Sequence, residues 1–230
     1  MNYLDLFSGI GGFALGSKYA GMEFKNHFYS EIDDYANMVY SKHFPKAIRL
    51  GDVCNIHAVD ADIITGGFPC QPFSTASHQH KTAIDLWPQM IRIIKNSKPG
   101  YICAENVSKK AIIVANGDLN GLGYKTSVKC IGAHEIGGDH KRNRWWLFAH
   151  TDDESEFFSL IDAKVAELQN MENTMWRWEN YARTIRISHG LSNRMDRFRC
   201  LGNAVIPVIP KIFFESISET GCRAITRHCV

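Results

Sequence analysis

Short apolar runs alternate with amphipathic segments along the first half of the chain. Four apolar runs have the length of buried strands: 3–7, 24–29, 62–65 and 101–104. Three amphipathic segments between them predict helices: about 11–20, 33–42 and 84–96. Strands that alternate with helices of this length favour a parallel sheet with helices on both faces. The sequence therefore predicts the α/β fold class.

The pattern changes in the second half of the chain. Residues 145–149 are apolar and predict one more strand, but residues 151–156 include four acidic side chains. The polar, tryptophan-containing stretch that follows predicts a small irregular lobe. After a turn at Gly202, the apolar-rich segment 208–218 predicts a helix that folds back onto the sheet. We expect a main domain over 1–150, a short lobe over 151–197 and a returning C-terminal segment over 198–230.

Composition and charge narrow the function classes only slightly. The chain has 230 residues, of which 45% are hydrophobic, so it can form a real core. Its formal net charge of +2 permits a polyanionic partner without requiring one. The seven cysteines are scattered, with no CxxC pair, so we expect no metal site. The odd cysteine count, and the lack of a secretory signal or a run of about 18 apolar residues, indicate a cytoplasmic protein without disulfides or a membrane span.

The loop after the strand 62–65 contains the strongest candidate for a catalytic residue. Cys70 lies between Pro69 and Pro72, directly after a pair of glycines. The two prolines stiffen the backbone and hold the thiol in one place, as a nucleophile requires. The alternative is a buried structural cysteine, which is the usual fate of a lone Cys. The flanking prolines and glycines favour the nucleophile.

The segment 5–14 has the pattern of a strand, a glycine-rich turn and a helix. Glycines permit a tight turn and close approach of a ligand, and the following helix offers unpaired N–H groups at its start. We therefore expect a nucleotide-type pocket here. The spacing Gly9-x-Gly11-x-x-Ala14 also fits the dinucleotide fingerprint, so the motif alone does not separate NAD from other adenosine ligands.

Two acidic residues follow further predicted strands on the same edge. Glu31 ends the second strand, about 20 residues after the glycine turn, where a carboxylate would accept hydrogen bonds from ribose hydroxyls. Asp52 ends an expected third strand, and its carboxylate would meet an adenine amino group. The alternative for each is a helix cap or a solvated turn.

Five segments of the sequence together resemble the ordered motifs of the DNA cytosine-5 methyltransferases. They are Asp5 to Gly12, Pro69-Cys70-Gln71-Pro72, Glu105-Asn106-Val107, Arg142-x-Arg144 and Gly202-Asn203-Ala204-Val205. The motifs span nearly the whole chain apart from roughly 151–197, and the chain is similar to the small phage- or prophage-type bacterial enzymes. The resemblance implies a Rossmann-like methyltransferase sheet, S-adenosyl-L-methionine (AdoMet) as methyl donor, and double-stranded DNA as substrate.

The resemblance also implies a chemical role for two strand-end residues. Carbon 5 of cytosine is a poor nucleophile, and in the family a thiolate, here Cys70, adds to carbon 6 to activate it. Glu105 would neutralise charge at ring nitrogen 3, a role that favours a raised carboxyl pKa. Asn106 would orient the loop. The alternative for Glu105 is an ordinary cap at a strand end.

Arg142 and Arg144 alternate along the entry to the strand 145–149, so both side chains point to one face. Two guanidiniums there suit the base carbonyl, the thiolate environment and a phosphate. The alternative is a solvated basic edge that includes Lys141. The resemblance assigns fifteen residues to the AdoMet pocket: Phe7, Ser8, Gly9, Ile10, Gly11, Gly12, Glu31, Ile32, Asp52, Val53, Pro69, Leu86, Asn203, Ala204 and Val205.

Contacts with DNA are expected from the loop after Cys70 and from the predicted lobe. The target base lies inside a duplex, so an enzyme of this kind must flip it out. The polar loop 74–81 resembles the one that closes over DNA, and the alternative is an ordinary surface loop. Acidic residues at 152–156 would repel phosphates, so the basic stretch 173–199 is the better candidate, or else a packing segment. The DNA-binding candidates are Gln71, Ser74, Ser77, Arg183, Arg194 and Arg197.

Several alternatives of function remain open from the sequence. The same chemistry on tRNA is one, because a branch of the family acts there. A non-catalytic DNA-binding or regulatory member with the same fold is another, and a nicotinamide dehydrogenase is the third, from the glycine turn alone. We expect the protein to be a monomer.

Overall fold

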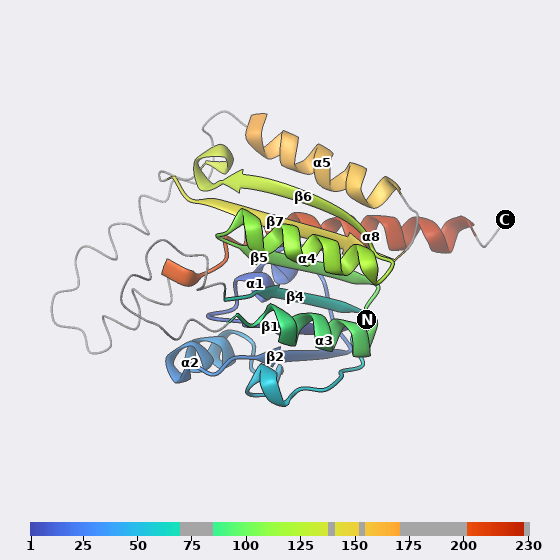
Figure 1. Ribbon diagram of the computed structural model, residues 1–230. Coiled ribbons are helices and arrows are strands. Elements are labelled where there is room, and N and C mark those ends of the chain that lie inside the picture. The colour runs from blue at the N-terminus through green and yellow to red at the C-terminus, as the bar shows by residue number, and fades with distance from the viewer. Residues whose placement is uncertain (70–84, 138–140, 152–154, 171–201, 228–230) are drawn as a thin grey trace.

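The computed structural model describes residues 1–69, 85–137, 141–151, 155–170 and 202–227. Its centre is a seven-stranded sheet in the order β3-β2-β1-β4-β5-β7-β6 (Figure 1). The strands are β1 (Asn2–Leu6), β2 (Asn26–Ser30), β3 (Ile48–Arg49), β4 (Ile63–Gly67), β5 (Tyr101–Asn106), β6 (Lys125–Gly132) and β7 (Asn143–His150). Strands β1 to β5 are parallel, and β7 is antiparallel to both of its neighbours.

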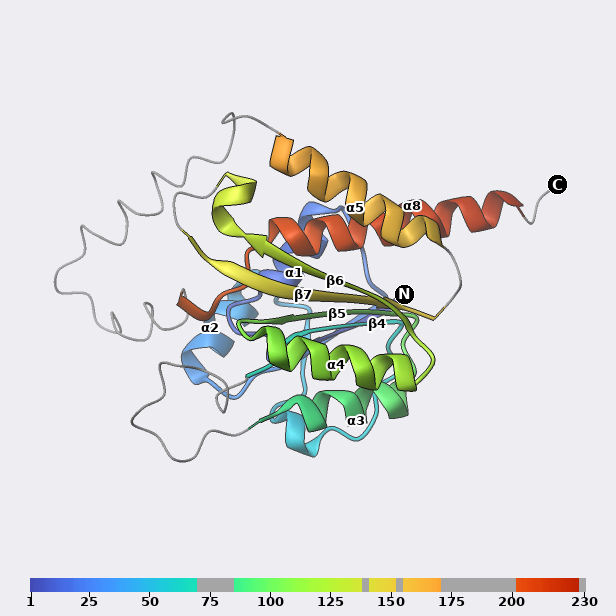
Figure 2. The ribbon, with the colours of Figure 1, turned by 45° about the horizontal axis from the view of Figure 1, so that its top comes forward.

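Helices cover both faces of this sheet (Figure 2). One face packs against α3 (Trp87–Ser97) and α4 (Lys109–Gly121), and the other against α1 (Gly12–Tyr19), α5 (Ser155–Asn170) and α8 (Val208–Arg227). Helix α2 (Asp34–His43) adds Tyr40 to the second layer. Successive strand residues point to opposite faces, so Ile64 packs with the first layer and Ile63 with the second.

The expected α/β class and the helices on both faces are confirmed, with two corrections to the sheet. The sheet is mixed rather than parallel, because β7 runs against its neighbours. The third strand is only Ile48–Arg49 and ends three residues before Asp52. Strand β6 and helix α4 were not predicted. Strand β6 lies at the edge of the sheet with most of its residues partly or fully exposed, so its sequence lacks an apolar run.

Residues 155–170 differ from the irregular lobe that the sequence predicts over 151–197. They form α5, which packs against α8 and buries Phe157, Ile161 and Val165 in the main core. These three residues are four apart and share one face of the helix. Residues 171–197 of the predicted lobe lie outside the described residues. The division into domains therefore stays a prediction.

Candidate active site

The carboxyl ends of β4 and β5 bring Glu105 beside the segment that leads to Cys70. Gly67 is paired with Glu105 in the β4–β5 register. A Cβ atom on Gly67 would lie 3.2 Å from Glu105 Oε2, so the glycine leaves room for the carboxylate to approach β4. Cys70 follows Gly67 by three residues and lies outside the described residues.

The Asn106 side chain links three backbone segments at this edge. Its Nδ2 donates to the carbonyl of Phe68 at 2.8 Å, and its Oδ1 accepts from the N–H of Ser108 at 2.8 Å. Ser108 in turn caps α4 through the N–H of Ala111. Asn106 thus connects the last residues before the cysteine loop to the start of α4, and its hydrogen bond to Phe68 is buried. This arrangement suits the predicted role of orienting the loop.

Glu105 has a buried and strongly charged environment. It is 8% exposed, and its Oε1 lies 2.8 Å from Nε of Arg144. Burial raises the pKa of the Glu105 carboxyl to about 6, although the charges of Arg144 and Arg142 oppose this change. A carboxyl with such a pKa gains and loses a proton near neutral pH, which suits a general acid. The raised pKa that the predicted role favours is therefore present.

Arg144 contacts this carboxylate from the start of β7, and Arg142 lies close enough for its charge to act on the carboxylate. The Arg142 side chain is half-buried, and its Nη2 donates to the carbonyl of Ala204 at 2.7 Å. Burial, with the neighbouring charge of Arg144, lowers the pKa of the Arg142 guanidinium below its usual value. Two guanidiniums with one carboxylate leave an excess of positive charge, which favours a thiolate or a phosphate. These contacts differ from the solvated basic edge left open by the sequence.

The glycine turn after β1 has an unusual backbone. Phe7, Gly9 and Gly11 have φ angles of 53°, 52° and 91°, in the left-handed region. Phe7 is not a glycine, so this conformation costs roughly 1–3 kcal/mol that the surrounding structure must offset. The buried Ser8 hydroxyl between them donates to the carbonyls of Asp5 and Ser30, and the Ser8 N–H donates to Ser30 as well. The turn is thus fixed by hydrogen bonds to β1 and β2.

Glu31 accepts three backbone hydrogen bonds at the end of β2. Its Oε2 accepts from the N–H of Gly9, and its Oε1 from Ile32 and Asp33, each at 2.8 Å. The carboxylate therefore joins the glycine turn to the loop before α2. Glu31 lies at the edge of the sheet where the sequence predicts a ribose contact, and that contact stays a prediction.

The segment before α8 packs directly against the glycine turn. A Cβ atom on Gly12 would lie 2.5 Å from the carbonyl oxygen of Val205, so only glycine permits this approach. Ala204 receives the Arg142 hydrogen bond described above. The 204–205 segment therefore touches both the glycine turn and the start of β7, and the cofactor role of these residues stays a prediction.

Residues 1–190 match the family model for C-5 cytosine-specific DNA methylases. The chain belongs to this family. This membership also decides between the ligands that fit the glycine turn, because the match covers the turn and the cysteine loop together. It removes the main reason for considering a nicotinamide dehydrogenase.

Individual relatives agree with the family match. The chain is 34% identical over 181 residues to Type II methyltransferase M.HaeII of Haemophilus aegyptius, which covers 73% of this chain and 56% of the relative. It is 30% identical over 227 residues to M.NgoBI of Neisseria gonorrhoeae, covering 93% of this chain and 68% of the relative. The chain thus spans little more than half the length of M.HaeII.

Two solved structures have the same fold at low sequence identity. One is described as a DNA modification methyltransferase encoded within an E. coli prophage, with a TM-score of 0.62 and 18% identity. The alignment covers 95% of this chain and 99% of that one. The other is the S. pombe Dnmt2 methyltransferase, with a TM-score of 0.63 and 18% identity over 86% of this chain and 65% of that one.

The family residues Asp52 and Val53 lie in a turn rather than at a strand end. Asp52 is exposed and caps the short helix η1 (Val53–Asn55), where its Oδ1 accepts from the N–H of Cys54 at 2.9 Å. This is the capping role that the sequence left open, and the adenine contact stays a prediction. Ile32 is 67% exposed, and a Cβ atom on Gly9 or Gly51 would meet nothing within 4 Å. Among the described residues, the space beside these two glycines is therefore unfilled.

Some of the remaining predicted site residues are described by the structure, and others lie outside the described residues. Pro69, Leu86 and Ile10 are half-buried, and Asn203 is exposed. Seven candidates lie outside the described residues: Cys70, Gln71, Ser74, Ser77, Arg183, Arg194 and Arg197.

A buried polar group below the glycine turn was missed by the sequence analysis. Asp5 on β1 is 0% exposed, and its carboxyl accepts from the hydroxyls of Thr65 at 3.0 Å and Tyr40 at 3.2 Å. Burial raises the pKa of the Asp5 carboxyl well above its usual value. The Tyr40 ring also lies against Gly11, so these bonds fix α2 beside the turn. The available signal was an acidic residue inside an otherwise apolar strand.

The described residues include neither a candidate membrane span nor a candidate metal site. No described helix is long and apolar enough to cross a membrane. Within the same residues there is no group of three or more His, Cys, Asp or Glu side chains placed to hold a metal ion.

Proposed function

We propose that this protein transfers a methyl group from AdoMet to carbon 5 of a flipped cytosine in double-stranded DNA. The observation that supports it most is the buried Glu105 with a pKa of about 6, paired with Arg144 at the end of the strand beside the Cys70 segment. The Type II methyltransferases among its relatives support the same activity.

In the proposed reaction, Cys70 and Glu105 act on different atoms of the cytosine ring. The Cys70 thiolate adds to carbon 6, and Glu105 donates a hydrogen bond or a proton to nitrogen 3, so that negative charge does not accumulate on the ring. The electron pair then becomes available at carbon 5, which takes the methyl group. S-adenosylhomocysteine is left after this transfer, and the proton on carbon 5 would pass to solvent water. Departure of the Cys70 thiolate from carbon 6 and return of the nitrogen 3 proton to Glu105 would then restore the ring and the enzyme. Arg142 and Arg144 would stabilise the thiolate and hold the base carbonyl.

AdoMet supplies an electrophilic methyl group when it is bound. The residues that would hold it lie on the open edge formed by the glycine turn, Glu31, Ile32 and the Asp52 turn. The carboxylate oxygens there are acceptors for ribose hydroxyls and an adenine amino group, and Ile32 offers an exposed apolar surface. Leu86, Pro69 and the 203–205 segment would complete the pocket.

Substrate contacts and assembly complete the proposal. Gln71, Ser74 and Ser77 would contact the flipped nucleotide and its strand, and Arg183, Arg194 and Arg197 would contact phosphates. The protein would act as a monomer in the cytoplasm, where the DNA of bacteria such as those of its relatives lies.

Methyl sequencing of a plasmid propagated with the gene tests the activity and finds the recognition site together. We expect 5-methylcytosine at one short sequence, and none with Cys70→Ser. In vitro, a covalent adduct should form between the protein and duplex DNA containing 5-fluorocytosine when AdoMet is present. Unmethylated plasmid together with no adduct would overturn the proposal. Methyl incorporation into tRNA but not into duplex DNA would replace it with the tRNA activity.

A further inference from the structure

We propose that Arg92 on α3 is a positioning residue that fixes the adenine-binding turn of the AdoMet pocket. The turn comprises residues 51–56 and contains Asp52, the predicted adenine contact, and Val53, another predicted pocket residue. The inference rests on the proposed function, because it assumes that AdoMet binds at this edge. Arg92 is not itself among the predicted cofactor residues and would act through the turn.

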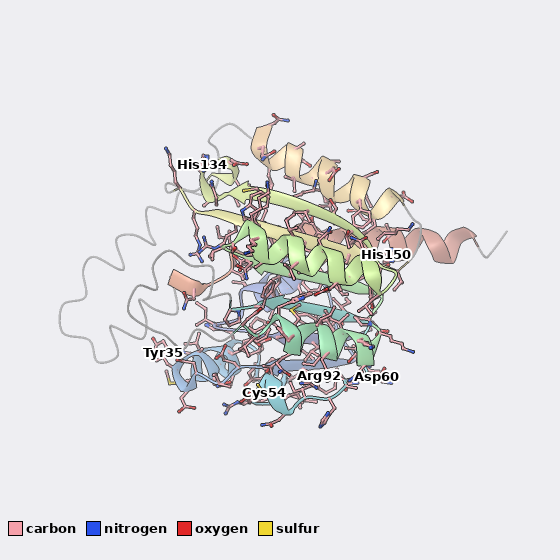
Figure 3. The ribbon with its side chains drawn as sticks, viewed as in Figure 1. Tyr35, Cys54, Asp60, Arg92, His134 and His150 are labelled. Carbon is pink, nitrogen blue, oxygen red and sulfur yellow. The ribbon has the colours of Figure 1, made fainter. Side chains whose placement is uncertain are left out.

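The Arg92 guanidinium binds one end of this turn through several backbone oxygens. Its Nη1 donates to the carbonyl of Ile56 at 2.6 Å, and its Nη2 lies 3.3 and 3.4 Å from the carbonyls of Val53 and Cys54. Its Nε and Nη2 also donate to Oε1 of Gln89, one turn earlier on α3. Figure 3 labels Arg92 and Cys54, which lie near each other on α3 and η1. Gln89 thus orients the Arg92 guanidinium, whose N–H groups also hold the turn.

The turn needs this support because secondary structure gives it little. Helix η1 has only three residues, so no further helical turn follows whose N–H groups could donate to its last carbonyls. These carbonyls carry partial negative charge, which a guanidinium neutralises. Two backbone hydrogen bonds close the turn internally, from the N–H of Asn55 to the carbonyl of Asp52 and from the N–H of Ile56 to that of Val53, and the Asp52 carboxylate accepts from the N–H of Cys54. No described strand includes residues 51–62.

The two ends of the turn have different anchors. Before Asp52, the Ser30 hydroxyl on β2 donates to the carbonyl of Gly51 at 2.7 Å. After Asp52, Arg92 is the side chain that reaches the carbonyls of residues 53–56. Asn96 and Ser97, further along α3, bind the backbone of His57 and Val59 and so hold only the segment that follows. Removing Arg92 therefore releases residues 53–56, which follow Asp52, while Ser30 still holds Gly51 and α3 still holds His57 and Val59.

Helix α3 also connects the turn to another predicted pocket residue. Leu86 is the N-cap of α3, and its carbonyl accepts from Gln89 and Met90. The same helix therefore positions Leu86, at its start, and the Asp52 turn, through Arg92. Lysine cannot replace this arrangement, because its ammonium is a compact charge without the planar fork of arginine.

Ligand binding to Arg92→Met, with Lys95→Met as matched control, tests the inference. Lys95 is exposed on the same helix, so its variant removes the same charge without touching the turn. Calorimetry should give a Kd for S-adenosylhomocysteine about tenfold higher in Arg92→Met, which is about 1.4 kcal/mol of binding free energy, because the turn loses its charged hydrogen bonds. The Kd of the control should match wild type, and Arg92→Lys should lie between. In methyl transfer, KM for AdoMet should rise with kcat changed less than about twofold.

A second ligand separates positioning from a general structural defect. S-inosylhomocysteine has an oxygen where adenine has its amino group, so wild type should bind it more weakly than S-adenosylhomocysteine. Arg92→Met should lose much of this discrimination, because Asp52 no longer has one position. Equal weakening for both ligands, or unchanged binding, would overturn the inference. If Arg92→Met does not fold, Arg92→Lys gives the same comparison. A wild type that binds neither AdoMet nor S-adenosylhomocysteine would instead overturn the proposed function.

Discussion

The two ends of the candidate site are built in different ways. Around the glycine turn, Glu31, Asp52 and Ser8 bind backbone N–H and carbonyl groups, so the shape of the main chain defines the pocket. At the end of β5 and the start of β7, Glu105 and two arginines lie close together in a largely buried cluster. The first region is fixed by close packing and backbone geometry, and the second by a balance of charges.

This difference predicts separate consequences for mutation. Changes in the glycine region should act on cofactor affinity and on stability, because they alter shape. Changes in the charged region should act on the rate and on its pH dependence, because they alter protonation. If a change in one region had the effect expected of the other, the two regions would depend on each other.

The largest effect is expected from Glu105→Gln in the charged region. Glutamine keeps the size of the side chain but cannot donate a proton, so kcat should fall by about 10²- to 10⁴-fold. The Kd for AdoMet should change less than about twofold. Glu167→Gln on the exposed face of α5 removes a carboxylate elsewhere and should leave both unchanged. A large loss of AdoMet affinity in Glu105→Gln would contradict the division between the regions.

Gly12→Ala should have the next largest effect, in the glycine region. The new Cβ would lie 2.5 Å from the carbonyl oxygen of Val205, and a backbone atom cannot move aside easily. We expect a loss of about 2–3 kcal/mol in the free energy of unfolding, and weaker AdoMet binding. Gly117→Ala in α4 meets nothing within 4 Å and should stabilise the protein slightly, since alanine is the better helix former. Urea unfolding of the two variants gives the comparison; equal stabilities would refute it.

The pH dependence of stability should also separate the charged region. The Glu105 pKa rises from 4.5 to about 6 on folding, so the folded state binds this proton more tightly. The associated stability is present below about pH 4.5 and is lost as the pH rises through 6. It amounts to about 2 kcal/mol. The difference in unfolding free energy between wild type and Glu105→Gln, measured from pH 4 to pH 7.5, should change by this amount in favour of the variant. A constant difference would show that the carboxyl pKa is not raised.

Sequence patterns predicted most of the parallel half of the fold, and for physical reasons. Buried parallel strands must be apolar on both faces, so β1, β4 and β5 are visible as apolar runs. Helix α4 escaped because Ile113 and Val114 are exposed and two glycines interrupt its pattern. The direction of β7 escaped because periodicity is the same in parallel and antiparallel strands. Helix α5 had a usable signal in Phe157, Ile161 and Val165, but the acidic residues before it suggested a polar lobe.

The candidate site divides in the same way. Glu105, Arg144 and the glycine turn were found because their residue types and spacing are unusual. Arg92 was not, because an arginine on an amphipathic helix looks like an ordinary solvated residue until its backbone acceptors are known. The approach of Gly67 to Glu105 likewise depends on strand register. Contacts between side chains and distant main chain have no local pattern to detect.

The smallest predicted effect, that of Gly9→Ala, distinguishes the backbone of the glycine turn from the space beside it. Gly9 has a φ of 52°, so alanine should cost about 1 kcal/mol of stability, but its Cβ would meet nothing within 4 Å. That methyl group would enter the space proposed for AdoMet. The Kd for AdoMet should therefore rise by more than the loss of stability accounts for. Gly21→Ala, with a φ of 70° and equal space beyond the other end of α1, should lose stability alone. If both variants bind AdoMet as wild type does, the ligand lies elsewhere, and the glycine region serves the fold rather than the cofactor.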